Sequence, residues 1–354
     1  MNRRSFVAAT LAAPAVPSSA APTESAPGRP ALRCSPDGTF RILAISDLHY
    51  TPRIDVHGIA LAERLIDTEK PNLVVVNGDC LSGKDSQSES ELRTSIGHVA
   101  AAMEKKQVPW AITFGNHDQE HCPKTQIGKE AVLAIYSAYP HNLNGGYARG
   151  LHGAGNKNLV VWNAAGTKPV YSVWLLDSQD YFQDGKNRSY DWIHTDQVLW
   201  YYQTSSELEK QHGAKVPGLM FFHIPLCEFN EMVNHAKIIG TRQEHESPSP
   251  VNSGLFAALL DRGDVRGVYC GHDHVNNYVG RWRGIELGYD GSLGHYTYPH
   301  VQPDDPSNLH VRGGRVFEIT DGAPARHRTW MRFKDGSKNW ESLSDAYIHD
   351  QIKD

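Results

Sequence analysis

The sequence predicts an α/β fold, because short apolar runs typical of strands alternate with segments of helical spacing. The first strand-like runs lie at residues 40–45, 73–76 and 109–114. The segments with helical spacing that follow them lie at 54–70, 89–106 and 128–138. Strands that alternate with helices are joined by crossover connections, so we expect a sheet that these helices cover.

The same alternation continues in the second half of the chain. Further strands are predicted at 159–162, 170–176, 219–222 and 265–269, and helices at 194–211 and 252–260. Shorter strands separated by turn residues are predicted at 278–289, 315–320 and 327–333. Because no repeat divides this region, we expect one domain over residues 38–335 and a C-terminal tail over residues 336–354.

The composition is that of a globular protein. Hydrophobic residues make up 40% of the 354 residues and charged residues 21%, which excludes a disordered or collagen-like chain. Lys and Arg number 35 against 40 Asp and Glu, so there is no basic excess that would bind a nucleic-acid backbone. The chain contains 19 histidines, a residue suited to metal binding and acid–base chemistry.

Residues 1–30 are predicted to be an export signal with its linker. The pair Arg3-Arg4 precedes a short apolar stretch at 8–16, and small residues follow around Ala20. The stretch is shorter than the ~18 residues that span a bilayer, and the arginine pair is typical of a twin-arginine signal. We therefore expect a periplasmic or secreted protein without a membrane span after the signal is removed.

Five polar motifs follow strand-like runs at the point where each run ends. They are Asp47-Leu48-His49, Gly78-Asp79, Gly115-Asn116-His117-Asp118, His223 and Gly271-His272-Asp273-His274. In an open α/β sheet the carboxyl ends of the strands meet at one edge, where ligands bind. Residues two apart on an extended segment face the same side, so the first and last motifs can each direct two ligands at one point.

The donor types predict a metal site with two ions. Asp, His and Asn supply oxygen and nitrogen ligands that suit Zn, Fe or Mn. One catalytic ion takes about three or four protein ligands, whereas the motifs offer Asp47, His49, Asp79, Asn116, His223, His272 and His274. Two ions that share a carboxylate account for the larger number of donors.

In their order, the motifs resemble those of the calcineurin-like metallophosphoesterases: D-x-H, GD, GNH, H and GHxH. The resemblance covers most of the chain after residue 30 and implies a four-layer αββα sandwich of two mixed sheets flanked by helices. It also implies that one metal is held by Asp47, His49, Asp79 and His274. The other metal is then held by Asp79, Asn116, His223 and His272, with Asp79 bridging the two ions.

Longer segments around the motifs narrow the resemblance: Gly115-Asn116-His117-Asp118-Gln119-Glu120, His223-Ile224-Pro225-Leu226 and Thr241-Arg242-Gln243-Glu244. These segments are similar to plant and fungal phosphatases related to the purple acid phosphatases. The purple enzymes carry a tyrosine three residues after the aspartate of GD, and a glycine where this chain has the histidine of D-x-H. Here those positions are Ser82 and His49. The resemblance is therefore to the non-purple branch, without an Fe(III)–tyrosinate centre.

The resemblance implies hydrolysis of phosphate esters by a metal-bound hydroxide at a dinuclear centre. Phosphomonoesters are the expected substrates, either small phosphorylated molecules or phosphoproteins. A phosphodiesterase of the same superfamily is the alternative, because the same metals cleave both ester types. A non-catalytic metal-binding protein is a third interpretation, which an incomplete ligand set would favour.

Three further residues are candidates for roles beside the metals. His117 follows a predicted ligand and is expected to protonate the leaving alkoxide or hold a phosphoryl oxygen. Asp118 is expected to orient His117. Arg242 is a candidate to hold a substrate phosphate with its forked guanidinium, and a solvated surface position fits this residue equally well.

Overall fold

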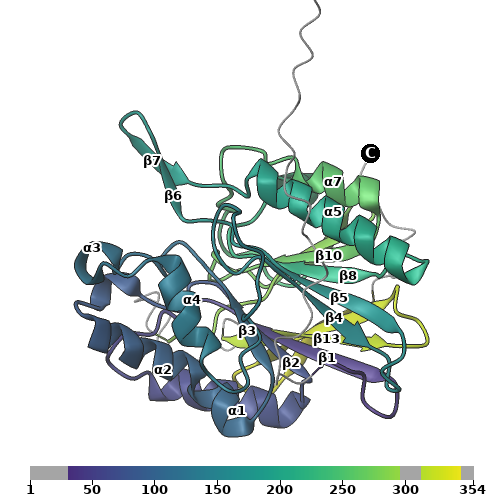
Figure 1. Cartoon of the computed structure of the whole chain (residues 1–354), viewed down its shortest axis with the longest axis horizontal. Coiled ribbons are helices and arrows are strands. Elements are labelled where there is room, and N and C mark those ends of the chain that lie inside the picture. Colours follow the sequence, from purple (N-terminus) through teal and green to yellow (C-terminus); the bar gives the residue numbers. More distant parts are fainter. Residues whose placement is uncertain (1–30, 296–311, 344–354) are drawn as a thin grey trace, which may run out of the picture.

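The computed structural model describes residues 31–295 and 312–343. In these residues two mixed β-sheets pack face to face, and helices cover the outer face of each sheet (Figure 1). The predicted αββα sandwich is therefore confirmed. The predicted export signal at 1–30 lies outside the described residues and stays a prediction.

The first sheet has six strands in the order β15-β14-β13-β1-β2-β3. They are β1 (Thr39–Ile45), β2 (Leu73–Asn77), β3 (Trp110–Thr113), β13 (Gly313–Thr320), β14 (His327–Phe333) and β15 (Lys338–Leu343). Strands β1, β2 and β3 are parallel, and the pairings that add β13, β14 and β15 are antiparallel. Every residue of β2 and β3 is buried, which explains their continuous apolar sequences.

The second sheet has seven strands in the order β4-β5-β8-β10-β12-β11-β9. They are β4 (Lys157–Trp162), β5 (Pro169–Leu175), β8 (Gly218–Phe221), β9 (Ile238–Ile239), β10 (Val265–Cys270), β11 (Val279–Trp282) and β12 (Ile285–Tyr289). Strands β5, β8, β10 and β12 are parallel. The carboxyl ends of β8 and β10 therefore lie at the same edge of this sheet.

The helices form the two outer layers. Helices α1 (Val56–Glu69), α2 (Glu89–Lys106) and α4 (Lys129–Ser137) pack on the first sheet, whereas α5 (Thr195–His212), α6 (Glu228–His235) and α7 (Leu255–Arg262) pack on the second. The short helix α3 (Cys122–Thr125) and the 3₁₀ turn η1 (Gly83–Asp85) lie in the loops after β3 and β2. Asp55 caps the N-terminus of α1, because its side chain accepts hydrogen bonds from two backbone N–H groups of the first turn.

A mixed apolar and polar layer joins the two sheets. The ring centroids of Tyr269 on β10 and Phe317 on β13 lie 4.4 Å apart, within an apolar cluster between the sheets. Beside them, Nε2 of His327 on β14 lies 2.9 Å from Oε1 of Glu286 on β12. The hydroxyl of Tyr269 donates to the same carboxylate. The sandwich is thus held by a buried polar contact as well as by apolar packing.

Several elements differ from the sequence prediction. Strands β6 (Tyr181–Asp184) and β7 (Asn187–Tyr190) form a two-stranded hairpin that projects from the body (Figure 1). Residues 338–343, expected in a C-terminal tail, pair with β14 as β15, which corrects the expected boundary at residue 335. A polar edge strand with one neighbour lacks the apolar pattern that identifies a buried strand. Within 31–295 and 312–343, no helix is long and apolar enough to cross a membrane.

Candidate metal centre

Five strands from the two sheets deliver the five polar motifs to one place. In the first sheet, Asp47 and His49 follow β1, Asp79 follows β2, and Asn116 follows β3. In the second sheet, His223 follows β8, and His272 and His274 follow β10. All seven side chains belong to loops at the carboxyl ends of parallel strands, as the strand geometry predicts.

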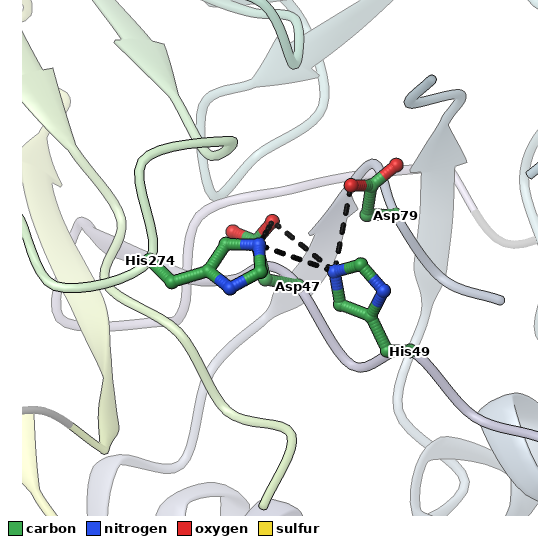
Figure 2. Close-up of side chains that lie close together, drawn as sticks. All are labelled: Asp47, His49, Asp79 and His274. Carbon is green, nitrogen blue, oxygen red and sulfur yellow. Dashed lines mark hydrogen bonds and ion pairs between the residues drawn. The ribbon is translucent and has the colours of Figure 1, made fainter. Parts of the chain in front are cut away.

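The first group of ligand atoms belongs to Asp47, His49, Asp79 and His274, and these atoms all lie within 4.8 Å of one another. Nε2 of His49 lies 3.2 Å from Nε2 of His274 and 3.4 Å from Oδ2 of Asp79. Nε2 of His274 lies 3.3 Å from Oδ1 of Asp47. Figure 2 shows the two rings directed toward each other, with His49 also directed toward both carboxylates and His274 toward that of Asp47.

The second group shares Asp79 with the first. Ligand atoms of Asp79, His223 and His272 all lie within 4.8 Å of one another, and Nε2 of His223 is 3.1 Å from Oδ2 of Asp79. Asn116 is joined to this group through the next residue, because the backbone N–H of His117 donates to Oδ1 of Asp79 at 2.9 Å. Since both groups contain Asp79, its carboxylate lies between two possible cation positions.

The side-chain atoms of these groups fit metal ions better than they fit one another. Buried atoms without a hydrogen-bond partner among the described residues include Oδ1 of Asn116 and Nε2 of His272. A buried polar atom left unpaired is costly, and such atoms are rare unless they serve a ligand. Nδ1 of His223 lies 2.9 Å from the carbonyl of Asn77, an arrangement that leaves Nε2 with a lone pair for a cation.

The backbone is strained at four of these residues. Positive φ angles occur at Asp47 (53°), His49 (48°), Asp79 (46°) and His272 (76°), in a region that non-glycine residues rarely occupy. Backbone hydrogen bonds hold the first two loops side by side: the N–H of Asp47 donates to the carbonyl of Gly78, and that of His49 to the carbonyl of Asp79. Strain of this kind persists where surrounding contacts enforce it, and it is concentrated at functional sites.

The glycines of the motifs make room for the ligands. A Cβ atom at Gly115 would overlap the carboxylate and backbone N of Asp79. At Gly78, which has a φ of +80°, a Cβ would lie 2.5 Å from the ring of His223. A Cβ at Gly271 would overlap the hydroxyl of Ser46, which donates to Asp47. The predicted role of these glycines beside the ligands therefore has a steric basis.

Charges in the cluster favour a cation. Burial raises the pKa of Asp47 and Asp79, but the facing histidines outweigh burial and hold both pKa values well below their usual range. Burial and the nearby charge of His223 lower the pKa of His272 to about 3. Burial also lowers the pKa of His223, yet the two carboxylates together outweigh it and raise that pKa to about 10. A bound cation would replace the proton that His223 otherwise carries.

His117 lies beside the cluster, but its partner is not the predicted one. Nδ1 of His117 is 3.0 Å from Oε2 of Glu120, and its ring centroid is 5.1 Å from that of His49. The carboxylate of Asp118 instead accepts hydrogen bonds from the backbone N–H groups of Leu81 and Gly115. The prediction that Asp118 orients His117 is wrong, because the buried Asp118 ties together the loops after β2 and β3.

Arg242 is paired within its own loop. Its Nε and one terminal nitrogen donate to the two carboxylate oxygens of Glu246 at 2.8 and 2.7 Å. The Glu246 side chain is fully buried, so the pair has a structural role. Contact between Arg242 and a substrate phosphate stays a prediction.

Sequence reasoning missed the two tyrosines at the base of the β6–β7 hairpin. Nδ2 of Asn116 donates to the hydroxyl of Tyr181 at 2.8 Å, and the ring centroid of Tyr190 lies 4.4 Å from that of His272. Gly185 is a signal that could have revealed this hairpin, because it is the first of the two turn residues between Asp184 and Asn187, a position where tight hairpin turns favour glycine. Glu120 was also missed, although it lies three residues after His117.

Residues 40–276 match the family model for calcineurin-like phosphoesterases. The chain belongs to the calcineurin-like phosphoesterase family. The matched region contains all five motifs, so the expectation from their order is confirmed. The structure likewise contains a candidate dinuclear site formed by residues of these motifs.

Relatives of this family member include named phosphatases. The chain is 33% identical to the probable inactive purple acid phosphatase 14 of Arabidopsis thaliana, over 91% of this chain and 86% of that protein. It is 29% identical to phosphatase DCR2 of Saccharomyces cerevisiae, over 71% of this chain and 46% of that protein. A dimetal phosphatase from Danio rerio has a similar fold, with a TM-score of 0.56 and 13% identity, over 86% of this chain and 98% of that chain.

Proposed function

We propose that this protein hydrolyses phosphate monoesters with two metal ions. The observation that carries the proposal is the pair of ligand groups that share Asp79. One ion is assigned to Asp47, His49, Asp79 and His274, and the other to Asp79, Asn116, His223 and His272. The nitrogen and oxygen donors suit Fe, Zn or Mn.

When bound, two such ions lower the pKa of a coordinated water toward ~7 and neutralise charge on a phosphoryl group. In the part of the chain that the structure describes, the two ligand groups contain two carboxylates, those of Asp47 and Asp79. Two divalent cations would therefore leave a positive surplus that attracts a phosphate dianion. The buried walls of the site strengthen that attraction because little water screens it.

His117 is placed to act on the leaving group. Its side chain is 30% exposed, whereas those of His49 and Asp79 beside it are 11% and 1% exposed. Glu120 occupies Nδ1 of the ring, so Nε2 is the atom that would give a proton to the leaving alkoxide. Such a positioned acid accelerates departure of a poor leaving group by about 10²–10⁴-fold.

The name of the Arabidopsis relative contains the word inactive, which raises the question of a non-catalytic role here. In this chain the donors of both ligand groups are present, and His117 has an orienting partner. An incomplete set would favour a binding protein, whereas a complete set supports an enzyme.

Replacement of Asp79 by Asn tests the proposal. We expect the metal content to fall from about two ions per chain to one or none, and p-nitrophenyl phosphate turnover to fall about 100-fold or more. Elemental analysis after dialysis measures the first quantity and steady-state kinetics the second. Asp196→Asn is the matched control, because Asp196 pairs with His152 on the surface.

Full turnover by the Asp79→Asn protein with both ions retained would refute the assignment. The same preparations assayed with bis(p-nitrophenyl) phosphate test the monoester preference. Faster cleavage of the diester than of the monoester by the unaltered protein would replace our proposal with a phosphodiesterase.

A further inference from the structure

The β6–β7 hairpin has one face toward the candidate metal centre. Its register pairs Tyr181 with Tyr190 and Gln183 with Arg188. Side chains alternate between the two faces of a strand, so these four residues share one face. We call them the site-facing residues of the hairpin. Phe182 and Ser189, which pair with each other, lie on the opposite face.

Contacts at the hairpin base establish which face is turned to the site. The hydroxyl of Tyr181 accepts from Asn116, and the ring of Tyr190 meets the ring of His272 edge-on at 4.4 Å. Asn116 and His272 are both assigned to the second ion. The hairpin therefore stands beside this ion position and extends outward from it, as its projection in Figure 1 illustrates.

Arg188 is the next site-facing residue outward from the tyrosines. Its guanidinium carbon lies 3.5 Å from the ring centroid of Tyr181, and Tyr181 and Tyr190 stack on each other at 5.5 Å. Stacking engages the flat face of the guanidinium and leaves its N–H groups, which lie in the plane, available to a ligand. A single aromatic ring thus connects this cation to Asn116.

The guanidinium of Arg188 forms no ion pair within the part of the chain that the structure describes. Among the residues whose side chains the structure describes, no carboxylate lies within ion-pair distance of Arg188, and no hydrogen bond is formed by its guanidinium. The residue is exposed and is held in place by the tyrosine ring. An oriented, unpaired guanidinium beside a phosphate site is an anion-binding group.

We propose that Arg188 determines specificity by binding a second anionic group of the substrate. This inference rests on the proposed phosphatase function. The substrate class it names is a phosphate ester whose alcohol portion carries a further phosphate or carboxylate. The scissile phosphate would lie at the metal ions, and the second anion would reach the forked donors of Arg188 along the site-facing residues.

Binding of non-hydrolysable ligands to the metal-loaded protein tests this without relying on turnover. Calorimetry compares propylphosphonate, which has one anionic group, with propane-1,3-diyl bisphosphonate and 4-phosphonobutyrate. We expect the two doubly anionic ligands to bind at least about tenfold more tightly than propylphosphonate, as a charge-assisted pair implies. The bisphosphonate and the phosphonocarboxylate distinguish a second phosphate from a carboxylate.

Three variants locate the effect. Arg188→Gln should bind all three ligands with nearly the affinity of propylphosphonate, whereas Lys186→Gln, which removes the exposed cation of the hairpin turn, should keep the preference. Arg188→Lys keeps the charge but loses the fork and the flat stacking face, so it should retain only part of the preference. Metal content and circular dichroism measured on each variant show that the site is loaded and folded.

Two results would overturn the proposal. The first is equal affinity of the unaltered protein for the three ligands. The second is an equal loss of affinity for all three ligands in Arg188→Gln. Either result would show that Arg188 does not bind a second anionic group. If the loaded protein bound no phosphonate and hydrolysed no phosphate ester, the proposed function would fail and this inference with it. If propylphosphonate binds tightly but the three ligands bind equally, the inference about Arg188 fails while the proposed function stands.

Discussion

Glu120 places its Oε2 atom 3.0 Å from Nδ1 of His117. Burial lowers the pKa of His117, but the carboxylates of Glu120 and Asp79 outweigh burial and raise it. Because this ion pair engages Nδ1, Glu120 decides where Nε2 points. Glu120 is thus a positioning residue for the proposed acid.

Removal of Glu120 should affect poor leaving groups most. We expect Glu120→Ala to lower kcat on an alkyl phosphate about tenfold and on p-nitrophenyl phosphate less than about twofold, because nitrophenolate leaves without a proton. His117→Ala should show the same selectivity. The double variant should be no slower than His117→Ala alone, since the two side chains act as one unit. Equal losses on both substrates would argue against an acid role.

Gly115→Ala should disrupt the centre without unfolding the sandwich. The added Cβ would overlap the Asp79 carboxylate, so we expect loss of at least one ion per chain and a fall in turnover of tenfold or more, about the cost of a displaced ligand. Gly97→Ala in α2 is the control, because the nearest atom to its Cβ is 3.6 Å away. That control should raise the free energy of unfolding by about 0.5–1 kcal/mol, as glycine is a poor helix former. Elemental analysis and urea unfolding measure both effects.

Tyr181→Phe should weaken one metal position. The hydroxyl of Tyr181 holds Nδ2 of Asn116, which directs Oδ1 toward the proposed second ion. Its loss should reduce affinity for that ion about tenfold or more, the usual cost of removing a group that orients a ligand. Metal titration measures this. Tyr190→Phe keeps the ring against His272 and should leave affinity nearly unchanged; similar losses in both variants would contradict the role of the hydroxyl.

Stability should fall in acid partly through Glu286. Burial raises the pKa of Glu286, but His327 and its other partners outweigh burial, so the pKa lies below its usual value. A carboxyl whose pKa is depressed on folding stabilises the fold above its unfolded pKa, about 4.3, and this contribution is lost as the pH falls through the folded pKa. Glu286→Gln should therefore lose less unfolding free energy than the unaltered protein between about pH 5 and about pH 3. An equal loss in urea unfolding would show that this pair does not carry the effect.

The sequence predicted those helices and strands that are buried on one face or on both faces. The run at 73–76 is apolar throughout because both faces of β2 are covered, and it was found within one residue of its end. The hairpin strands β6 and β7 were missed, since partly buried and exposed polar residues make up most of their length. Strand β15 was missed for a related reason, because an edge strand has a neighbour on one side only.

The contrast between Asp118 and Glu120 shows where sequence reasoning stopped at the site. Both carboxylates follow His117 within three residues, and spacing alone does not say which one reaches the ring. The turn after β3 directs Asp118 inward to two backbone N–H groups and returns Glu120 to His117. Which carboxylate reaches His117 depends on how the loop at Leu81 packs against this turn, and Leu81 is far from Asp118 in the sequence.

The amino-acid sequence determined the identity of the donors, their order and their attachment to strand ends, because those features follow from local periodicity and residue chemistry. The tertiary structure decided which donors share Asp79, which carboxylate orients His117, and that a hairpin with Arg188 stands beside the site. These relationships join residues far apart in the chain, and only the packing of the two sheets sets the distances between them.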